Sequence, residues 1–250
     1  GLLLGPLLAG MVVLMTHVPL GREVLARGIV FVDLAIAQVA GLGLVAANRF
    51  ELPATGWPAQ AVAMAAALAA AALLTWLERR WPDIQEPLIG SLFVLAASLS
   101  ALFAANDPHG GEHLRDLLVG QILWVDGRQL TLSTLASVLL LGAWWRHGAG
   151  RLWLFHACLA LAVTVSVQLV GVYLVFASLI LPALAIRSLG RYQGLRTGLV
   201  LGTLGYAGGL IVSALLDWPS GPVIVVTLAL SAAATSGWLA RAQPSASAAS

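Results

Sequence analysis

The sequence contains no lysine, a single cysteine and few charged residues. Charged side chains make up 10% of the chain, whereas soluble globular domains carry about 25%. The cysteine, Cys158, lies in an apolar stretch, which excludes an internal disulfide and a thiolate metal cluster. The net charge is only +2, so the sequence gives no indication of nucleic-acid binding.

Apolar residues take the place of the missing charges and make up 60% of the 250 residues. A membrane-spanning helix needs about 20 apolar residues, so a series of spans with short connectors leaves no room for a sizeable soluble domain. We therefore expect an all-α integral membrane protein. Residues 1–20 have no basic segment and no small-residue cleavage site, so we do not expect a signal peptide.

Apolar runs interrupted by charge, proline and glycine predict a polytopic helical bundle of about nine transmembrane helices. We expect a single transmembrane domain over residues 1–240 and a polar, disordered tail over residues 241–250. The sixth and seventh spans nearly touch, which requires a tight or buried turn around residues 168–171. The predicted spans are 2–20, 28–47, 59–77, 88–105, 130–145, 152–168, 170–186, 198–216 and 223–240.

The positions of the arginines indicate an orientation, because positive residues accumulate in cytoplasmic loops. With the N-terminus outside, ten of the thirteen arginines fall in predicted inner loops or at the inner C-terminus. Only Arg49, Arg115 and Arg128 then lie outside. We therefore expect the N-terminus outside and the C-terminus inside.

Residues 170–198, VGVYLVFASLILPALAIRSLGRYQGLRTG, join an apolar span to a short basic loop. Arg187, Arg191 and Arg196 indicate that this loop is cytoplasmic. Pro182 lies in the last turns of the span, where its missing backbone donor predicts a kink. After this span we expect a short cytoplasmic helix lying across the membrane surface, and then another span.

That next span carries glycines at intervals of three or four residues. Such a ridge of small residues lets helix backbones approach closely inside a bilayer. The predicted helix-packing residues are Gly194, Gly198, Gly202, Gly205 and Gly209.

Asp33 and Gln38 are polar residues within the second predicted span. A carboxylate inside a span is costly and marks a functional candidate, but near the inner end Asp33 could also bind backbone or Arg27. Gln38 could join a polar pathway or bind a neighbouring helix. Five residues turn a helix by about 140°, so the two side chains do not form a ligand pair alone. His156 lies in the sixth span, where we expect packing ahead of ligand binding.

The predicted outer loop contains the polar sequence NDPHGGEHLRD. Imidazole and carboxylate groups together suit zinc or manganese. The loop could attract metal ions, contact a delivery protein, or be polar only because it is exposed. Its candidate metal ligands are Asp107, His109, Glu112 and His113.

Four stretches carry a resemblance to a known family. They are PLGREVLARGIVFVDLAIAQVAGLG, EPLIGSLFVLAASLSALF, LLVGQILWVD and VGVYLVFASLILPALAIRSL. In this order and spacing they resemble the permease subunits of bacterial ABC importers for zinc and manganese. The last stretch is similar to the family's Val-Gly, apolar run and Leu-x-x-Pro-Ala-x-x-Ala segment.

The resemblance implies a homodimeric pore in the bacterial inner membrane, two cytoplasmic ATP-binding subunits and an extracytoplasmic metal-binding protein. ATP hydrolysis would occur in the partner, so this chain would carry no catalytic residues and no permanently bound cofactor. The segment after the Leu-x-x-Pro-Ala pattern would dock on the ATPase. By position, the coupling residues would be Pro182, Ala185, Ile186, Arg187, Leu189, Gly190 and Arg191.

The second span departs from the family pattern, which commonly has Gly-Asp-x-x-x-His there. Aligned on the small residues that follow, Gln38 takes the place of the histidine, Leu34 that of the acid and Asp33 that of the glycine. The usual pore ligands are therefore displaced or missing. Either Asp33 and the outer loop coordinate the ion differently, or the substrate differs.

The resemblance implies ATP-driven import of a divalent metal by alternating access, with zinc ahead of manganese or iron because the outer loop offers imidazole. A permease for a chelated metal, such as a siderophore or corrinoid, is the neighbouring alternative. An ion-coupled carrier and an intramembrane metalloenzyme are alternatives of another class. The carrier would need more ionisable groups in mid-span, and the enzyme would need a paired ligand motif on a helix.

Overall fold

The structure is a computed structural model, which describes residues 3–49, 57–104, 122–147 and 151–242. All regular secondary structure in these ranges is helical, which confirms the predicted fold class. The α-helices are α1 (Leu4–Arg27), α2 (Val32–Arg49), α3 (Trp57–Arg80), α4 (Gln85–Ala104), α6 (Gly127–His147), α7 (Leu152–Val170), α8 (Val172–Ala185), α9 (Arg191–Leu216) and α10 (Ser220–Ala242). Two short 3₁₀ helices, η1 (Pro82–Ile84) and η2 (Ile122–Trp124), precede α4 and α6.

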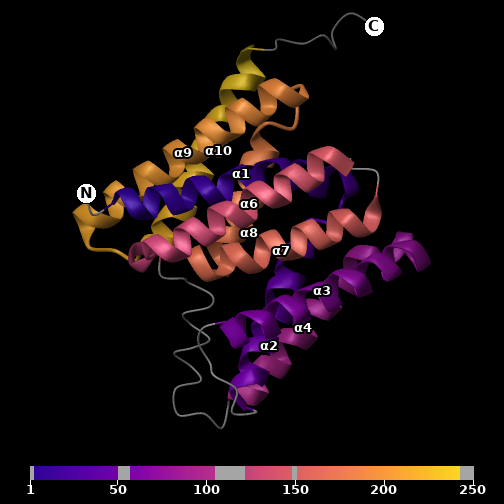
Figure 1. Ribbon diagram of the computed structural model, residues 1–250. Coiled ribbons are helices and arrows are strands. Elements are labelled where there is room, and N and C mark those ends of the chain that lie inside the picture. Colours follow the sequence, from indigo (N-terminus) through magenta and orange to yellow (C-terminus); the bar gives the residue numbers. More distant parts are fainter. Residues whose placement is uncertain (1–2, 50–56, 105–121, 148–150, 243–250) are drawn as a thin grey trace, which may run out of the picture.

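The helices form three groups (Figure 1). On one side α9 and α10 lie side by side, and on the other α2 packs against α3 and α4. Between these groups lie α1, α6, α7 and α8, with α1 in contact with α8 and α9, and α7 in contact with α3. The central helices α1, α7 and α8 are rich in buried apolar residues, whereas α6 and the outer helices expose large apolar side chains such as Leu95, Leu139, Leu204 and Leu230. Such faces suit lipid or another membrane protein rather than water.

Each of the nine predicted spans overlaps one of these α-helices, but the helices differ in length. Among the described residues, five are long and apolar enough to cross a membrane: α1, α3, α7, α9 and α10. The apolar helices α2 and α8 are shorter. With 14 residues, α8 measures about 21 Å at 1.5 Å per residue, which is less than the roughly 30 Å of the hydrocarbon core.

The first helix is longer than predicted. We expected the span to end near residue 20 and Arg22 and Arg27 to lie in a loop, but α1 continues through Arg27. Glu23 and Arg27 form an ion pair at i,i+4, with Nη2 and Oε1 2.9 Å apart, which stabilises the last turn. Gly28 then ends the helix at φ +71°, a left-handed conformation that glycine adopts without strain.

The connection between α7 and α8 is the single residue Gly171. Its φ of +83° is accessible to glycine and breaks the helix at this point. Val170 and Gly171 are both buried. The expectation of a tight or buried turn around residues 168–171 is confirmed.

The predicted short helix after the seventh span is not a separate element. Residues 186–190 form a turn, and Arg191 begins α9, which runs without a break to Leu216. The helix continues directly into the span because Gly194 and Gly198 let its first turns pack against Arg22 and Val18 of α1. At the other end of the chain α10 extends to Ala242, and the rest of the predicted tail, residues 243–250, lies outside the described ranges.

The glycines of α9 face two different helices. A Cβ on Gly198 would lie 2.8 Å from Val18 Cγ1, and one on Gly202 would lie 2.6 Å from Leu14 Cδ2, both on α1. Further along, a Cβ on Gly209 would lie 2.6 Å from Ile224 Cα of α10. Real side chains are not found at such distances, so the glycines let α9 approach α1 and then α10 closely.

We predict that Gly209→Ala destabilises the protein whereas Gly208→Ala does not. The added methyl group at Gly209 meets backbone of α10, which must move, and overpacking of this kind costs about 1–3 kcal/mol. A Cβ on Gly208, the next residue on the same helix, meets nothing within 4 Å. The measurement is the thermal unfolding midpoint of each purified variant in detergent, and equal midpoints for the two variants would contradict the close α9–α10 contact.

Candidate functional site

The segment from Pro182 to Arg191 joins the end of α8 to the start of α9 and has a buried and an exposed side. Ala185, Ile186 and Leu189 are buried in the helix bundle. Within the turn, Ile186 N–H donates to the Pro182 carbonyl and Leu189 N–H donates to the Ile186 carbonyl at 2.9 Å. The buried side chains and these hydrogen bonds hold the turn in a fixed conformation.

The opposite side of this segment, together with the first turns of α9, is exposed and basic. Arg187, Arg191 and Arg196 are all exposed, and Tyr192 beside them is 83% exposed. We call these four residues the basic surface. Arginine and tyrosine are enriched where proteins bind one another, so a surface that presents three guanidinium groups suits an acidic protein partner.

Arg22 of α1 binds the backbone of the same turn. Its Nη2 donates to the Leu189 carbonyl at 3.1 Å and its Nη1 donates to the Gly190 carbonyl at 3.5 Å. The guanidinium also lies against Gly194, where a Cβ would collide with it. The α8–α9 turn is therefore attached to α1 as well as to the two helices that it joins.

Asp33 and Gln38 lie on α2, as expected, and the structure does not bring them together with other metal ligands. Asp33 is in the first turn of α2 and 1% exposed, and its Oδ1 has no hydrogen-bond partner among the described residues. Gln38 is half-buried. In the described ranges there is no group of three or more His, Cys, Asp and Glu side chains arranged to hold a metal ion. The predicted outer-loop ligands Asp107, His109, Glu112 and His113 lie outside these ranges.

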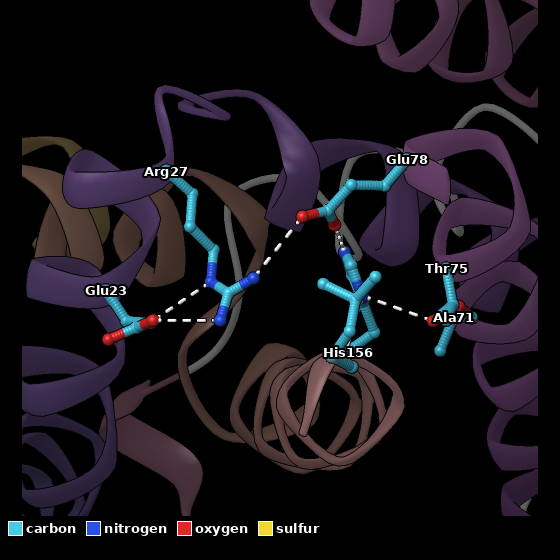
Figure 2. A network of polar contacts seen from close by, with 7 residues as sticks. Glu23, Arg27, Ala71, Thr75, Glu78 and His156 are labelled. Atoms are coloured by element: carbon cyan, nitrogen blue, oxygen red, sulfur yellow. Dashed lines mark hydrogen bonds and ion pairs between the residues drawn. The ribbon is translucent and has the colours of Figure 1, made fainter. Parts of the chain in front are cut away.

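A network of polar side chains joins α1, α3 and α7 (Figure 2). Arg27 Nε donates to Glu23 Oε1 at 2.9 Å, and Arg27 Nη1 donates to Glu78 Oε1 of α3 at 3.3 Å. The Arg27 guanidinium also stacks over the Phe155 ring of α7, 4.5 Å from its centroid. The three charged side chains are half-buried, and these contacts pair the two carboxylates through one guanidinium.

His156 completes the network from α7. The side chain is fully buried, and its Nε2 lies 3.3 Å from Glu78 Oε2. Its Nδ1 lies 3.2 Å from Thr75 Oγ1 of α3 and 3.2 Å from the Leu152 carbonyl. His156 therefore makes polar contacts with α3, in addition to the packing that we expected from the sequence.

Sequence reasoning missed the residues of α3 in this network. Glu78 stands directly before Arg79 and Arg80, so it resembles part of an exposed charge run at a span end. Thr75 precedes it by three residues, which places both side chains on one face of the helix. A carboxylate and a hydroxyl on one face of the last turns of an apolar span were the sequence feature that could have indicated this network.

Comparisons with known proteins agree with this architecture. Residues 2–146 and 151–236 match the model of the ABC 3 transport family. The fold is similar to that of PsaBC from Streptococcus pneumoniae, solved in complex with a Fab, over 94% of this chain and 91% of that one, with 19% identity and a TM-score of 0.75. It is also similar to a metal-chelate type ABC transporter in an inward-facing conformation, over 96% of this chain and 86% of that one, with 17% identity and a TM-score of 0.66. Because the family model matches well over half of the chain, the protein belongs to the ABC 3 transport family.

Proposed function

We propose that this chain is the membrane-spanning permease subunit of an ABC importer that moves a divalent metal ion into the cytoplasm. Family membership supports a transport function, and the similarity in fold to PsaBC supports an ABC transporter permease. Zinc is favoured over manganese or iron because the outer loop supplies His109 and His113 as well as carboxylates. A separate ATPase subunit hydrolyses ATP and drives alternating access.

The observation that carries this proposal is the basic surface on the α8–α9 turn. Arg187 projects from the turn, and Arg191 and Tyr192 project from the first turn of α9. The other side of the α8–α9 turn is buried, so force applied to these residues is passed to α8 and α9. Arg22 extends the connection to α1. An ATP-binding subunit docked on this surface can therefore move three helices of the bundle together.

The arrangement implies further partners and an orientation. The basic surface faces the cytoplasm, with the N-terminus outside and the C-terminus inside the bacterial inner membrane. A second copy of the chain and lipid cover the exposed apolar faces of the outer helices, because these faces are unsuited to water. An extracytoplasmic metal-binding protein delivers the ion at the opposite end, where the outer loop collects it before Asp33 and Gln38.

A permease for a chelated metal is the second candidate. The similarity to a metal-chelate type ABC transporter favours it, as does the displacement of the usual acid and histidine from the second span. Membership of the ABC 3 transport family favours both permease candidates over an intramembrane metalloenzyme or a stand-alone carrier.

Metal uptake tests the proposal directly. The permease, its ATPase and its binding protein are co-expressed, and cells are given radioactive zinc or manganese, free or as a chelate. We expect ATP-dependent accumulation of free zinc that competing manganese lowers only weakly. Accumulation of the chelate alone would establish the second candidate, and uptake that persists without the ATPase would contradict an ABC importer.

We predict that Arg191→Glu weakens ATPase binding at least tenfold. Reversing a charge on a surface that meets an acidic partner turns an attraction into a repulsion. Arg128→Glu is the matched control, because Arg128 is also an exposed arginine in the first turn of a helix, at the predicted outer end. Co-purification of the ATPase with each variant measures the effect, and equal losses in both variants would contradict docking at the α8–α9 turn.

We predict that Asp33→Asn lowers zinc uptake at limiting zinc at least tenfold. Asparagine keeps the shape of the side chain but removes the negative charge of the carboxylate, whose Oδ1 has no hydrogen-bond partner in the described part of the chain, so a cation on the pathway is bound less firmly. Asp83→Asn provides the control, because Asp83 is exposed in η1. Wild-type uptake by the Asp33 variant would remove this residue from the pathway.

A further inference from the structure

The hydrogen bonds of His156 determine which ring nitrogen carries a proton. Thr75 Oγ1 donates its hydrogen to the Ala71 carbonyl at 2.7 Å, so toward His156 Nδ1 it offers only a lone pair. The Leu152 carbonyl, the other neighbour of Nδ1, is also an acceptor. Nδ1 must therefore be the donor, and in a neutral imidazole the proton is then absent from Nε2.

The lone pair of Nε2 consequently faces a carboxylate. Nε2 lies 3.3 Å from Glu78 Oε2, both atoms are buried, and neither has a hydrogen-bond partner among the residues that the structure describes. Two lone pairs at this distance repel each other unless a cation lies between them. The cation is either a proton, carried by Nε2 or by Oε2, or a metal ion bound by both atoms.

The charges around the pair favour a cation. Glu23 and Glu78 carry two negative charges and Arg27 one positive charge, so these three side chains have a net charge of −1. Arg27 binds the other oxygen of Glu78, Oε1, which orients the carboxylate so that Oε2 points at His156 (Figure 2). The Arg27 guanidinium is thus a positioning group for the free oxygen.

We propose that Glu78 Oε2 and His156 Nε2 form a two-ligand binding site for the transported divalent metal ion at the inner end of the bundle. This inference rests on the proposed function. Two ligands about 2.0–2.1 Å from a tetrahedral zinc ion lie roughly 3.3–3.4 Å apart, which matches the observed separation of 3.3 Å. Glu78 lies near the end of α3 and His156 near the start of α7, at the end predicted to face the cytoplasm.

A site with only two protein ligands suits an ion in transit. A transport site must bind firmly enough for the ion to enter and weakly enough for it to leave. The ligands lie on different helices, α3 and α7, so a small separation of these helices breaks the site and releases the ion. One imidazole and one carboxylate favour zinc over manganese, which prefers oxygen ligands.

The chain contains a matched control for His156. His17 of α1 is also fully buried, its Nδ1 lies 3.0 Å from the Val13 carbonyl and 2.9 Å from Thr16 Oγ1, and its Nε2 has no hydrogen-bond partner in the described ranges. In those ranges no carboxylate lies within ion-pair distance of it, in contrast to His156. A substitution at His17 therefore removes a buried imidazole without removing a carboxylate–imidazole pair.

The test is equilibrium dialysis of radioactive zinc against the purified full-length permease in detergent. The parent protein carries Asp107→Ala, His109→Ala, Glu112→Ala and His113→Ala, which removes the four candidate ligands of the outer loop. We expect Glu78→Gln and His156→Gln each to weaken zinc binding at least tenfold, and His17→Gln to leave it unchanged. Glu78→Asp keeps the charge opposite Arg27 but withdraws the oxygen, and it should weaken binding as well, which keeps the test valid if the glutamine variants fail to fold.

Unchanged zinc affinity in the Glu78 and His156 variants would overturn the site and leave a protonated ion pair in its place. Equal weakening by His17→Gln would do the same, because it would reflect general disruption of the bundle. Uptake by the wild-type complex distinguishes failure of the Glu78–His156 site from failure of the proposed function. If the wild-type complex takes up zinc with ATP but the variants bind zinc as well as the parent, only the site is refuted. If the complex takes up no metal at all, the proposed function is refuted.

Discussion

The close packing of α1 against α9 determines where the polar groups of this protein lie. Leu14, Val18 and Arg22 follow one another at intervals of four residues on α1, and each faces a glycine of α9. A larger residue at any of these glycines would push the helices apart and withdraw Arg22 from the Leu189 carbonyl. A packing constraint within the apolar bundle therefore positions a charge-assisted hydrogen bond at its end.

The last turns of α1 also connect two regions that are far apart in the sequence. Arg22 and Arg27 are five residues apart, which places them about 140° apart around the helix. Arg22 therefore points to the α8–α9 turn, while Arg27 points to Glu78 of α3 and Phe155 of α7. A partner that moves the turn can act on the α3–α7 contact through one rigid helix, because backbone hydrogen bonds continue through both arginines.

The sequence predicted the helices well and the polar network poorly. Apolar runs locate helices because a backbone in lipid must satisfy its own hydrogen bonds, and each predicted span overlaps one helix. The predicted helix boundaries were wrong where side-chain contacts determine them. The Glu23–Arg27 ion pair extends α1, and the packing of α9 on α1 joins the predicted surface helix to α9. Glu78 was missed because its role depends on residues 51 and 78 positions away, Arg27 and His156, and such distant pairs leave no periodic pattern.

The helices that pack against α2 offer an explanation for the departure of the second span from the family pattern. A histidine four residues after an acid places both ligands on one face of one helix, and α2 lacks that pair. On our proposal, an imidazole and a carboxylate are instead contributed by α7 and α3, both of which pack against α2. A site within one helix keeps its geometry when helices move, whereas a site between two helices is lost when they separate. Moving the ligands from α2 to α3 and α7 would therefore couple release of the ion to the conformational change itself.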